Sequence, residues 1–320
     1  MLCVVGVASG ACGGSASPVP IGSRIGPALV ATLAAADQAR APWRCASADG
    51  PRLADGELKL GEHTWKLAGD TVSLEGGKGA IVIGVIADAG GSAPPTLAAL
   101  GRLRTQLADA DVVISLGGMG TTQPELEATL GTLADRAPWP LIAVPGDLES
   151  VAAQDAAIVA LRARNQVVID GRLARRIVVP GATIATVPGA SAAVRLVAGA
   201  DGCGYTSAEV STLFADLTTR PGLRIVASAE APRVTLRGEP AGELALTPGA
   251  LHEIDLSLHG PVTEAGSPAR SGGRDGAAIA LTPGTSDATT RLPGPRHAPS
   301  AGLLTVNGNS WRWKPLADAN

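Results

Sequence analysis

The chain has 320 residues and a formal net charge of −3, and only 2% of its residues are aromatic. This length can bury one large core or two ordinary ones. The composition offers neither the basic field nor the aromatic stacking surfaces of a nucleic-acid-binding protein, so we expect no nucleic-acid partner.

The first 20 residues differ from the rest of the chain. An apolar run at residues 2–8 leads to SGAC, ending at Cys12, and then to a Gly/Ser-rich tether, which is the order of parts in a bacterial lipoprotein leader. The usual positive segment is missing, and a disordered N-terminus with an incidental cysteine is the alternative. We predict a signal peptide with lipid on Cys12. The protein would then lie outside the cytoplasm on the bacterial cell envelope, touching the membrane through its lipid anchor only.

Two further cysteines, Cys45 and Cys203, would remain after removal of such a leader. An oxidising envelope compartment would allow them to form a disulfide. Two buried free thiols are the alternative, and the sequence leaves both possibilities open.

Residues 21–320 are predicted to form a single α/β domain. Residues 26–40 have the spacing and Ala content of a helix, and the alternating pattern at 57–76 predicts a small antiparallel meander. Three apolar runs that each lead into a helix lie at residues 80–88, 111–118 and 140–147. This alternation indicates right-handed crossovers in a largely parallel sheet.

The second half of the chain has a different pattern. Short β runs between residues 165 and 230 are joined largely by turns, with one helical stretch at 207–219, which predicts a second, partly antiparallel sheet. Residues 264–300 are loop-rich, and 302–315 predict a closing hairpin with an Asn-Gly turn. Arg172, Arg175 and Arg176 are expected to form a solvated basic face.

The three strand ends carry short motifs at regular spacing. They are ADAG at 87–90, GGMG at 117–120 and PGDLE at 145–149. Ligands bind beyond the carboxyl ends of strands in open α/β sheets. With VASAEAPR at 226–233 and LHGPVTEAG at 258–266, these motifs make the chain resemble a calcineurin-like metallophosphoesterase over about residues 80–266. That family's signature is D-x-H, G-D and G-N-H-D/E, then a later His and G-H-x-H.

The resemblance implies a four-layer αββα sandwich with mixed sheets and, in an active member, a centre for divalent Mn, Fe, Zn or Mg. Asp88 matches the family's first metal-binding aspartate, and most other ligands are replaced. Gly90 stands for the first His, Gly118 for the bridging Asp, Asp147 for the Asn, Leu148 for the His that stabilises the leaving group, Glu230 or Ala229 for the later His, and Pro261 and Thr263 for the last two. His259 lies just before that last motif.

Three functions follow from these departures. Because Gly118 cannot supply the shared carboxylate that makes two close cations tolerable, we expect a catalytically inactive pseudo-phosphoesterase without a cofactor, binding an unknown protein or small ligand at the vestigial site. A divergent phosphoric ester hydrolase could instead hold one hard cation through the set Asp88, Asp147, Glu149, Glu230 and His259. A metal-free module that binds an anion at the turn 117–120 is the third reading. Strand-end Gly and Asp also occur in other α/β folds.

Overall fold

The structure is a computed structural model that describes residues 42–77, 79–232, 234–236, 239–241, 253–261, 279–289 and 298–318. They belong to one compact unit, Ala41–Asn320. The predicted leader, the predicted helix at 26–40, Cys12, Thr263 and much of the loop-rich stretch lie outside the described residues. Within the described part of the chain, no helix is both long and apolar enough to cross a membrane.

One six-stranded sheet contains the predicted strand-helix units. Its order is β18 (Ser310–Ala317), β17 (Ser300–Asn307), β5 (Ile81–Ile86), β6 (Val112–Leu116), β7 (Leu141–Val144) and β8 (Val168–Asp170). Strands β5 to β8 are parallel. The β17–β18 hairpin adds to β5 in antiparallel fashion, so the sheet is mixed.

The second sheet has eight strands. Its order is β16 (Ile279–Leu281), β15 (Leu256–His259), β12 (Leu223–Ser228), β10 (Ala182–Val187), β9 (Arg176–Val179), β4 (Thr71–Glu75), β3 (His63–Ala68) and β2 (Gly56–Leu60). Strands β2, β3 and β4 form an antiparallel meander. Strands β10, β12, β15 and β16 are parallel, which makes this sheet mixed as well.

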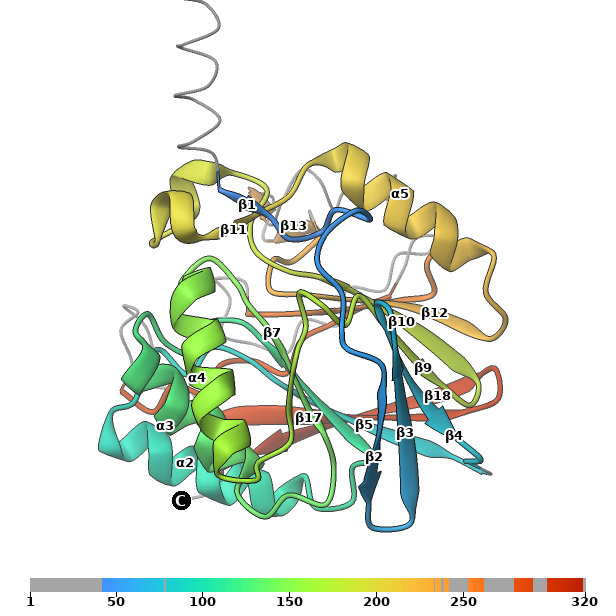
Figure 1. The fold of residues 1–320 in the computed structure, drawn as a ribbon, viewed down its shortest axis with the longest axis horizontal. Coiled ribbons are helices and arrows are strands. Elements are labelled where there is room, and N and C mark those ends of the chain that lie inside the picture. Colours follow the sequence, from blue (N-terminus) through green and yellow to red (C-terminus); the bar gives the residue numbers. More distant parts are fainter. Residues whose placement is uncertain are drawn as a thin grey trace, which may run out of the picture. The chain divides into compact units, whose positions relative to one another are not determined.

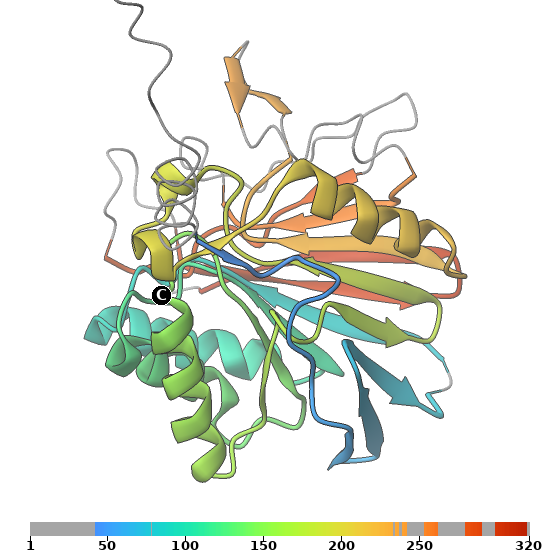
Figure 2. The same ribbon diagram turned by 45° about the horizontal axis from the view of Figure 1, so that its top comes forward.

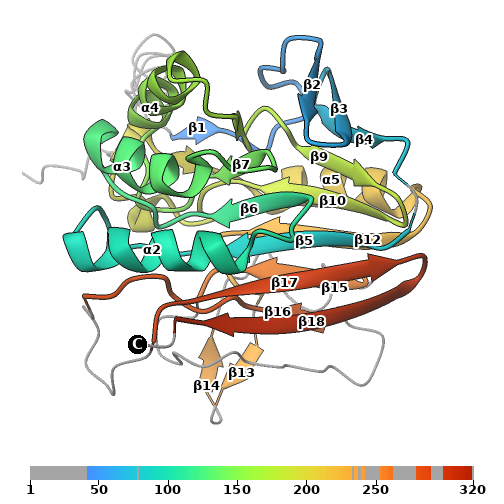
Figure 3. The same ribbon diagram turned by 90° about the horizontal axis from the view of Figure 1, so that it is seen from below.

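Hydrophobic side chains fill three separate layers of core. The largest core lies between the two sheets, a second lies between the six-stranded sheet and helices α2 (Pro94–Gln106), α3 (Gln123–Ala134) and α4 (Val151–Ala163), and a third lies under α5 (Ser207–Thr218). Figures 1 and 3 show α5 on the outer face of one sheet and the other three helices on the outer face of the second. The predicted four-layer αββα sandwich with mixed sheets is confirmed.

The sequence pattern of β5 explains why both faces of its sheet are covered. Ile83 and Val85 enter the core between the sheets, while Ile86 enters the core under the helices. Successive side chains of a strand point to opposite faces. A strand that is buried on both faces therefore reads as a continuous apolar run.

Side-chain caps fix the starts of α3 and α5. Thr122 and Glu125 form a capping box at the start of α3, and Thr206 and Glu209 form one at the start of α5. In each, the hydroxyl accepts from the backbone of the Glu, whose carboxylate returns to the backbone of the Thr. The helix therefore begins directly after the strand-end loop.

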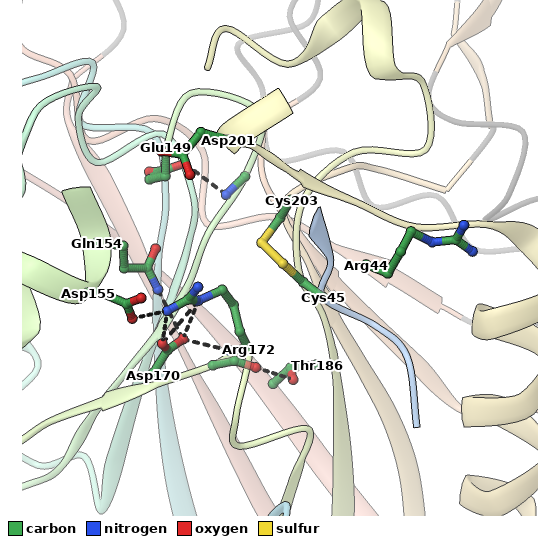
Figure 4. Close-up of a disulfide and its surroundings, with 12 residues drawn as sticks. Arg44, Cys45, Glu149, Gln154, Asp155, Asp170, Arg172, Thr186, Asp201 and Cys203 are labelled. Atoms are coloured by element: carbon green, nitrogen blue, oxygen red, sulfur yellow. Dashed lines mark hydrogen bonds and ion pairs between the residues drawn. A yellow bond between two sulfur atoms is a disulfide. The ribbon is translucent and has the colours of Figure 1, made fainter. Parts of the chain in front are cut away.

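A disulfide joins the first described residues to the middle of the chain. Strand β1 (Trp43–Arg44) pairs in parallel with β11 (Cys203–Gly204), and Cys45 and Cys203 are bonded beside this short ladder (Figure 4). Both cysteines pack against Val151 of α4 in a small cluster of buried residues. The bridge therefore holds β1 against the body of the domain.

The expectation of a solvated basic face at residues 172–176 is wrong. The Arg172 side chain is 9% exposed and pairs with Asp170 and Asp155 (Figure 4), and Arg175 is buried. Neighbouring carboxylates and backbone carbonyls compensate the loss of water around a buried guanidinium. These arginines thus stabilise the inner structure and offer no basic patch.

Candidate functional site

The carboxyl ends of strands from both sheets meet at one edge of the sandwich. The six-stranded sheet contributes Asp88 after β5, Gly117 after β6 and Gly146 after β7, and the eight-stranded sheet contributes Ala229 after β12 and Gly260 after β15. A Cβ at Gly117 would lie 2.9 Å from the Cβ of Ala229 and 2.6 Å from the backbone N of Gly146. The family motifs of the sequence therefore lie together in space.

Two glycines follow β6, and their backbone lies close to the neighbouring strand ends. Gly117 and Gly118 both have positive φ, 69° and 70°, a conformation that suits glycine. A Cβ at Gly118 would lie 2.8 Å from the Cα of Asp88. The backbone at Gly118 therefore leaves no room for a carboxylate side chain.

Asp88, which follows β5, has an unusual backbone conformation. Its φ is 52°, a region that non-glycine residues rarely adopt. The segment after β16 fixes this turn, because the Asp88 carbonyl accepts from the Thr285 hydroxyl at 2.8 Å and from the Ser286 N–H at 3.1 Å. Next to it, a Cβ at Gly90 would lie 2.9 Å from a carboxylate oxygen of Asp287.

Glu149 directs its carboxylate to the strand-end loops. One oxygen accepts from the Met119 N–H at 2.6 Å and the other from the Gly146 N–H at 2.8 Å. Burial raises the pKa of Glu149, and the backbone N–H groups partly oppose this rise. The side chain of this residue, which is 2% exposed, thus joins the ends of β6 and β7.

The side chains of Asp147 and Glu230 both face the guanidinium of Arg195. Nη1 of Arg195 is 2.9 Å from Oε1 of Glu230, and its Nη2 is 3.7 Å from Oδ2 of Asp147. Oε2 of Glu230 accepts from the Ser191 N–H at 3.1 Å and from the Tyr205 hydroxyl. The Glu230 side chain is 2% exposed, so its charge is compensated inside the protein.

His259 ends β15 as a buried, neutral imidazole. Its Nδ1 lies 2.7 Å from the Gly260 carbonyl oxygen, and because that oxygen can only accept, Nδ1 carries the hydrogen. Burial lowers the pKa of His259 to about 4, although the hydrogen bond to Gly260 favours the protonated form. Leu148 and Pro261 are partly exposed and supply no ionisable group.

The candidate ligands do not converge on one point. Among the described residues, no group of three or more His, Cys, Asp or Glu side chains could hold a metal ion. Glu149 faces backbone N–H groups, Asp147 and Glu230 face Arg195, and His259 donates to a carbonyl. The residues present therefore do not fit the two-metal centre that the resemblance implies.

Sequence reasoning missed Arg195, which follows no motif. It ends the 3-10 turn η1 (Ala193–Arg195), far along the chain from both of its carboxylate partners. Tyr205 was missed as well, because a lone tyrosine before a helix carries no functional signal. The available hint was the acidic residue Glu230 directly after an apolar strand, since a charge that is buried there needs a partner.

Comparisons with known proteins find similarity in the fold and none in the sequence. No protein-family model matches the sequence, and no curated protein matches it. Solved structures do match: TT1561 of Thermus thermophilus aligns with 73% of this chain and 98% of its own, at 14% identity and a TM-score of 0.48. Purple acid phosphatase PPD1 from yellow lupin (Lupinus luteus) seeds aligns over 79% and 56%, at 12% identity and a TM-score of 0.46.

A further solved chain aligns over its whole length and over 74% of this one, at 9% identity and a TM-score of 0.52. At such identities the likeness concerns the fold alone, and the roles of site residues must be argued from the geometry of this chain.

Proposed function

We propose that the chain is a catalytically inactive protein with a metallophosphoesterase-like fold, held on the outside of a bacterial cell by lipid on Cys12. Its strand-end edge would bind or scaffold a protein or small ligand without metal. The observation that carries this proposal is the position of Arg195 between Asp147 and Glu230.

The guanidinium of Arg195 opposes metal binding in two ways. It compensates the charge of Glu230, whose side chain is 2% exposed and also accepts from Ser191 and Tyr205. It would also repel a divalent ion placed 4 Å away by about 8 kcal/mol at an effective dielectric constant of about 20. A metal ion that approached Oε1 of Glu230 would therefore have to displace Arg195.

Glu149 supports the same conclusion independently of Arg195. Both of its oxygens already accept backbone N–H groups, so a cation would have to share these oxygens with buried donors. Leu148 stands where we place the His that stabilises the leaving group in the family, and its side chain has no proton to donate.

The test is metal content together with hydrolysis. We expect purified protein to carry no stoichiometric transition metal by elemental analysis. With added Mn²⁺, wild type should hydrolyse a generic phosphodiester no faster than Asp88→Ala. Stoichiometric metal, or turnover that Asp88→Ala abolishes, would contradict the proposal.

A pair of arginine variants tests the role of Arg195 directly. Arg195→Met removes the cation between two carboxylates and should increase the thermal shift produced by Mn²⁺. Arg44→Met is the matched control, since Arg44 is also exposed and also pairs with a single Glu, Glu209. Equal Mn²⁺ shifts in wild type, Arg195→Met and Arg44→Met would show that Arg195 does not exclude the ion.

One observation favours a divergent hydrolase as the second candidate. Asp88 keeps the family's residue type and is held at φ 52°, and strained residues gather at functional sites. In that case a single hard cation would use Asp88 with other oxygen ligands. The comparison of wild type with Asp88→Ala separates the two candidates.

The anchor has a separate test. Palmitate labelling of the full chain in a bacterial host should depend on Cys12 and be lost in Cys12→Ser. Equal labelling of the two proteins would remove the anchor from the proposal and leave the inactive site unaffected.

A further inference from the structure

Three of the four exposed large hydrophobic residues of the described structure lie on two segments whose backbones are hydrogen-bonded to each other. Only four large hydrophobic residues of the described chain are exposed: Trp43 by 55%, Val159 by 67%, Val194 by 93% and Val197 by 61%. Val159 lies alone on α4. The other three lie on β1 and on the segment 193–203, and we name them the apolar corner (Trp43, Val194 and Val197).

Backbone pairing brings these two segments together. The Trp43 N–H donates to the Gly202 carbonyl at 2.9 Å, and Trp43 is paired with Cys203 in the short ladder. Residues 193–203 run through η1 and η2 (Gly199–Asp201) into that ladder. Figures 1 and 2 both place β1 beside these two 3-10 turns.

The apolar corner is held firmly in its exposed position. Leu196, between the two valines, is 6% exposed. It packs closely against Gly202, where an added Cβ would lie 3.1 Å from the Cβ of Leu196. The Val197 N–H donates to the Asp147 carbonyl at 2.8 Å, and the Cys45–Cys203 disulfide ties β1 to the same segment. The turn thus buries Leu196 and fixes Val194 and Val197 on its outer side.

We propose that the apolar corner docks onto the surface of a lipid bilayer. This inference rests on the proposed lipid anchor, because the described unit begins directly beside Trp43. Residues 13–41 separate Cys12 from the described part of the chain, and 29 residues can reach at most about 100 Å. Anchoring would therefore keep this corner at a high local concentration near the membrane.

The chemistry of the corner suits a lipid surface. Tryptophan prefers the membrane interface, where its ring is buried and its N–H stays hydrated. The charged side chains around it give no excess of positive charge, since Arg44 pairs with Glu209, and Arg195 with both Glu230 and Asp147. The contact should therefore not depend on anionic lipid, and neutral phosphatidylcholine is the surface that tests it.

A second copy of the chain is a poorer occupant. A stable protein interface buries about 800 Å² and roughly 20–30 residues on each partner, whereas the apolar corner has three exposed apolar side chains. Insertion at a bilayer surface needs no such matching area. A lipid surface is therefore the occupant to which the geometry points.

The experiment uses the full lipidated chain reconstituted on phosphatidylcholine vesicles with brominated acyl chains, which quench nearby tryptophan. The fluorescence of Trp43 is obtained as the difference between the tryptophan fluorescence of wild type and that of Trp43→Phe. We expect this signal to be quenched in wild type and in Val159→Asp, the matched control, and to escape quenching in Val194→Asp/Val197→Asp. The milder Val194→Ser/Val197→Ser pair serves if the aspartate pair does not fold.

Three results would overturn the inference, and they differ from each other. Protein that stays on the vesicles while Trp43 is not quenched retains its anchor and does not dock. Protein that does not attach to vesicles at all has neither anchor nor docking surface. A change of oligomeric state in Val194→Asp/Val197→Asp, with quenching unchanged, would assign the corner to contact between copies.

Discussion

The guanidinium of Arg195 and the carboxylate of Glu230 form an ion pair with 2.9 Å between Nη1 and Oε1. Arg195 comes from a surface turn and is 40% exposed, while Glu230 follows a central strand and is 2% exposed. The other terminal nitrogen of Arg195 lies 3.7 Å from Asp147, beyond the end of β7. One side chain thus links strand ends of the two sheets.

Loss of this link should reduce stability. Arg195→Met removes the cation beside the buried Glu230 charge, which keeps its hydrogen bonds from the Ser191 N–H and the Tyr205 hydroxyl. We expect the free energy of unfolding in urea to fall by about 1–2 kcal/mol, less than for a fully buried pair because Arg195 is partly solvated. Arg44→Met should change it by less than about 1 kcal/mol. Equal losses would show that burial of Glu230 is unimportant.

Introducing a carboxylate at residue 118, the position that we propose corresponds to a bridging Asp, should fail for steric reasons. In Gly118→Asp, the new Cβ would lie 2.8 Å from the Cα of Asp88 and the backbone would have to keep φ at 70°. Strain of this kind costs roughly 1–3 kcal/mol before the overlap is counted. We therefore expect a lower melting temperature and no gain in Mn²⁺ binding.

Gly101 provides the control for that substitution. It lies inside α2, and a Cβ there would have nothing within 4 Å. Gly101→Ala should raise the free energy of unfolding by up to about 1 kcal/mol. A stable Gly118→Asp that binds Mn²⁺ would show that the end of β6 can reopen.

The layers of the fold were predictable because local pattern and burial agree there. The runs at residues 80–88, 111–118 and 140–147 are apolar on both faces, and strands between two covered faces require that pattern. The motif at each strand end also located the edge where the two sheets meet, since strand order and length place those ends together.

The partners of the site residues were not predictable in the same way. Arg195 reaches Glu230 from a turn that precedes β11 and the Cys45–Cys203 disulfide, and the sequence left the pairing of these cysteines open. Arg172 pairs with Asp170, two residues away in sequence, and also with Asp155 of α4, which only tertiary packing brings near. Long-range ion pairs are therefore the part of the site that required the structure.

The Cys45–Cys203 bridge should contribute strongly to stability. It closes a loop with a sequence separation of 158 residues, and bridges across long loops typically contribute about 2–4 kcal/mol. We expect dithiothreitol to lower the urea midpoint of wild type and to leave Cys45→Ser/Cys203→Ser unchanged. The same midpoint for oxidised and reduced wild type would contradict this expectation.

His259 should make stability depend on pH in a defined direction. Burial lowers the pKa of His259 from 6.5 to about 4, so between those values the unfolded chain binds a proton that the folded chain does not. The contribution of His259 to the free energy of unfolding is complete above pH 6.5 and is lost as the pH drops toward 4. The total loss is about 3 kcal/mol. In His259→Gln this contribution should vanish. Urea unfolding of both proteins at several pH values isolates this contribution, because Glu149 and the other titrating groups are common to both. Parallel curves would show that folding does not change the pKa of His259.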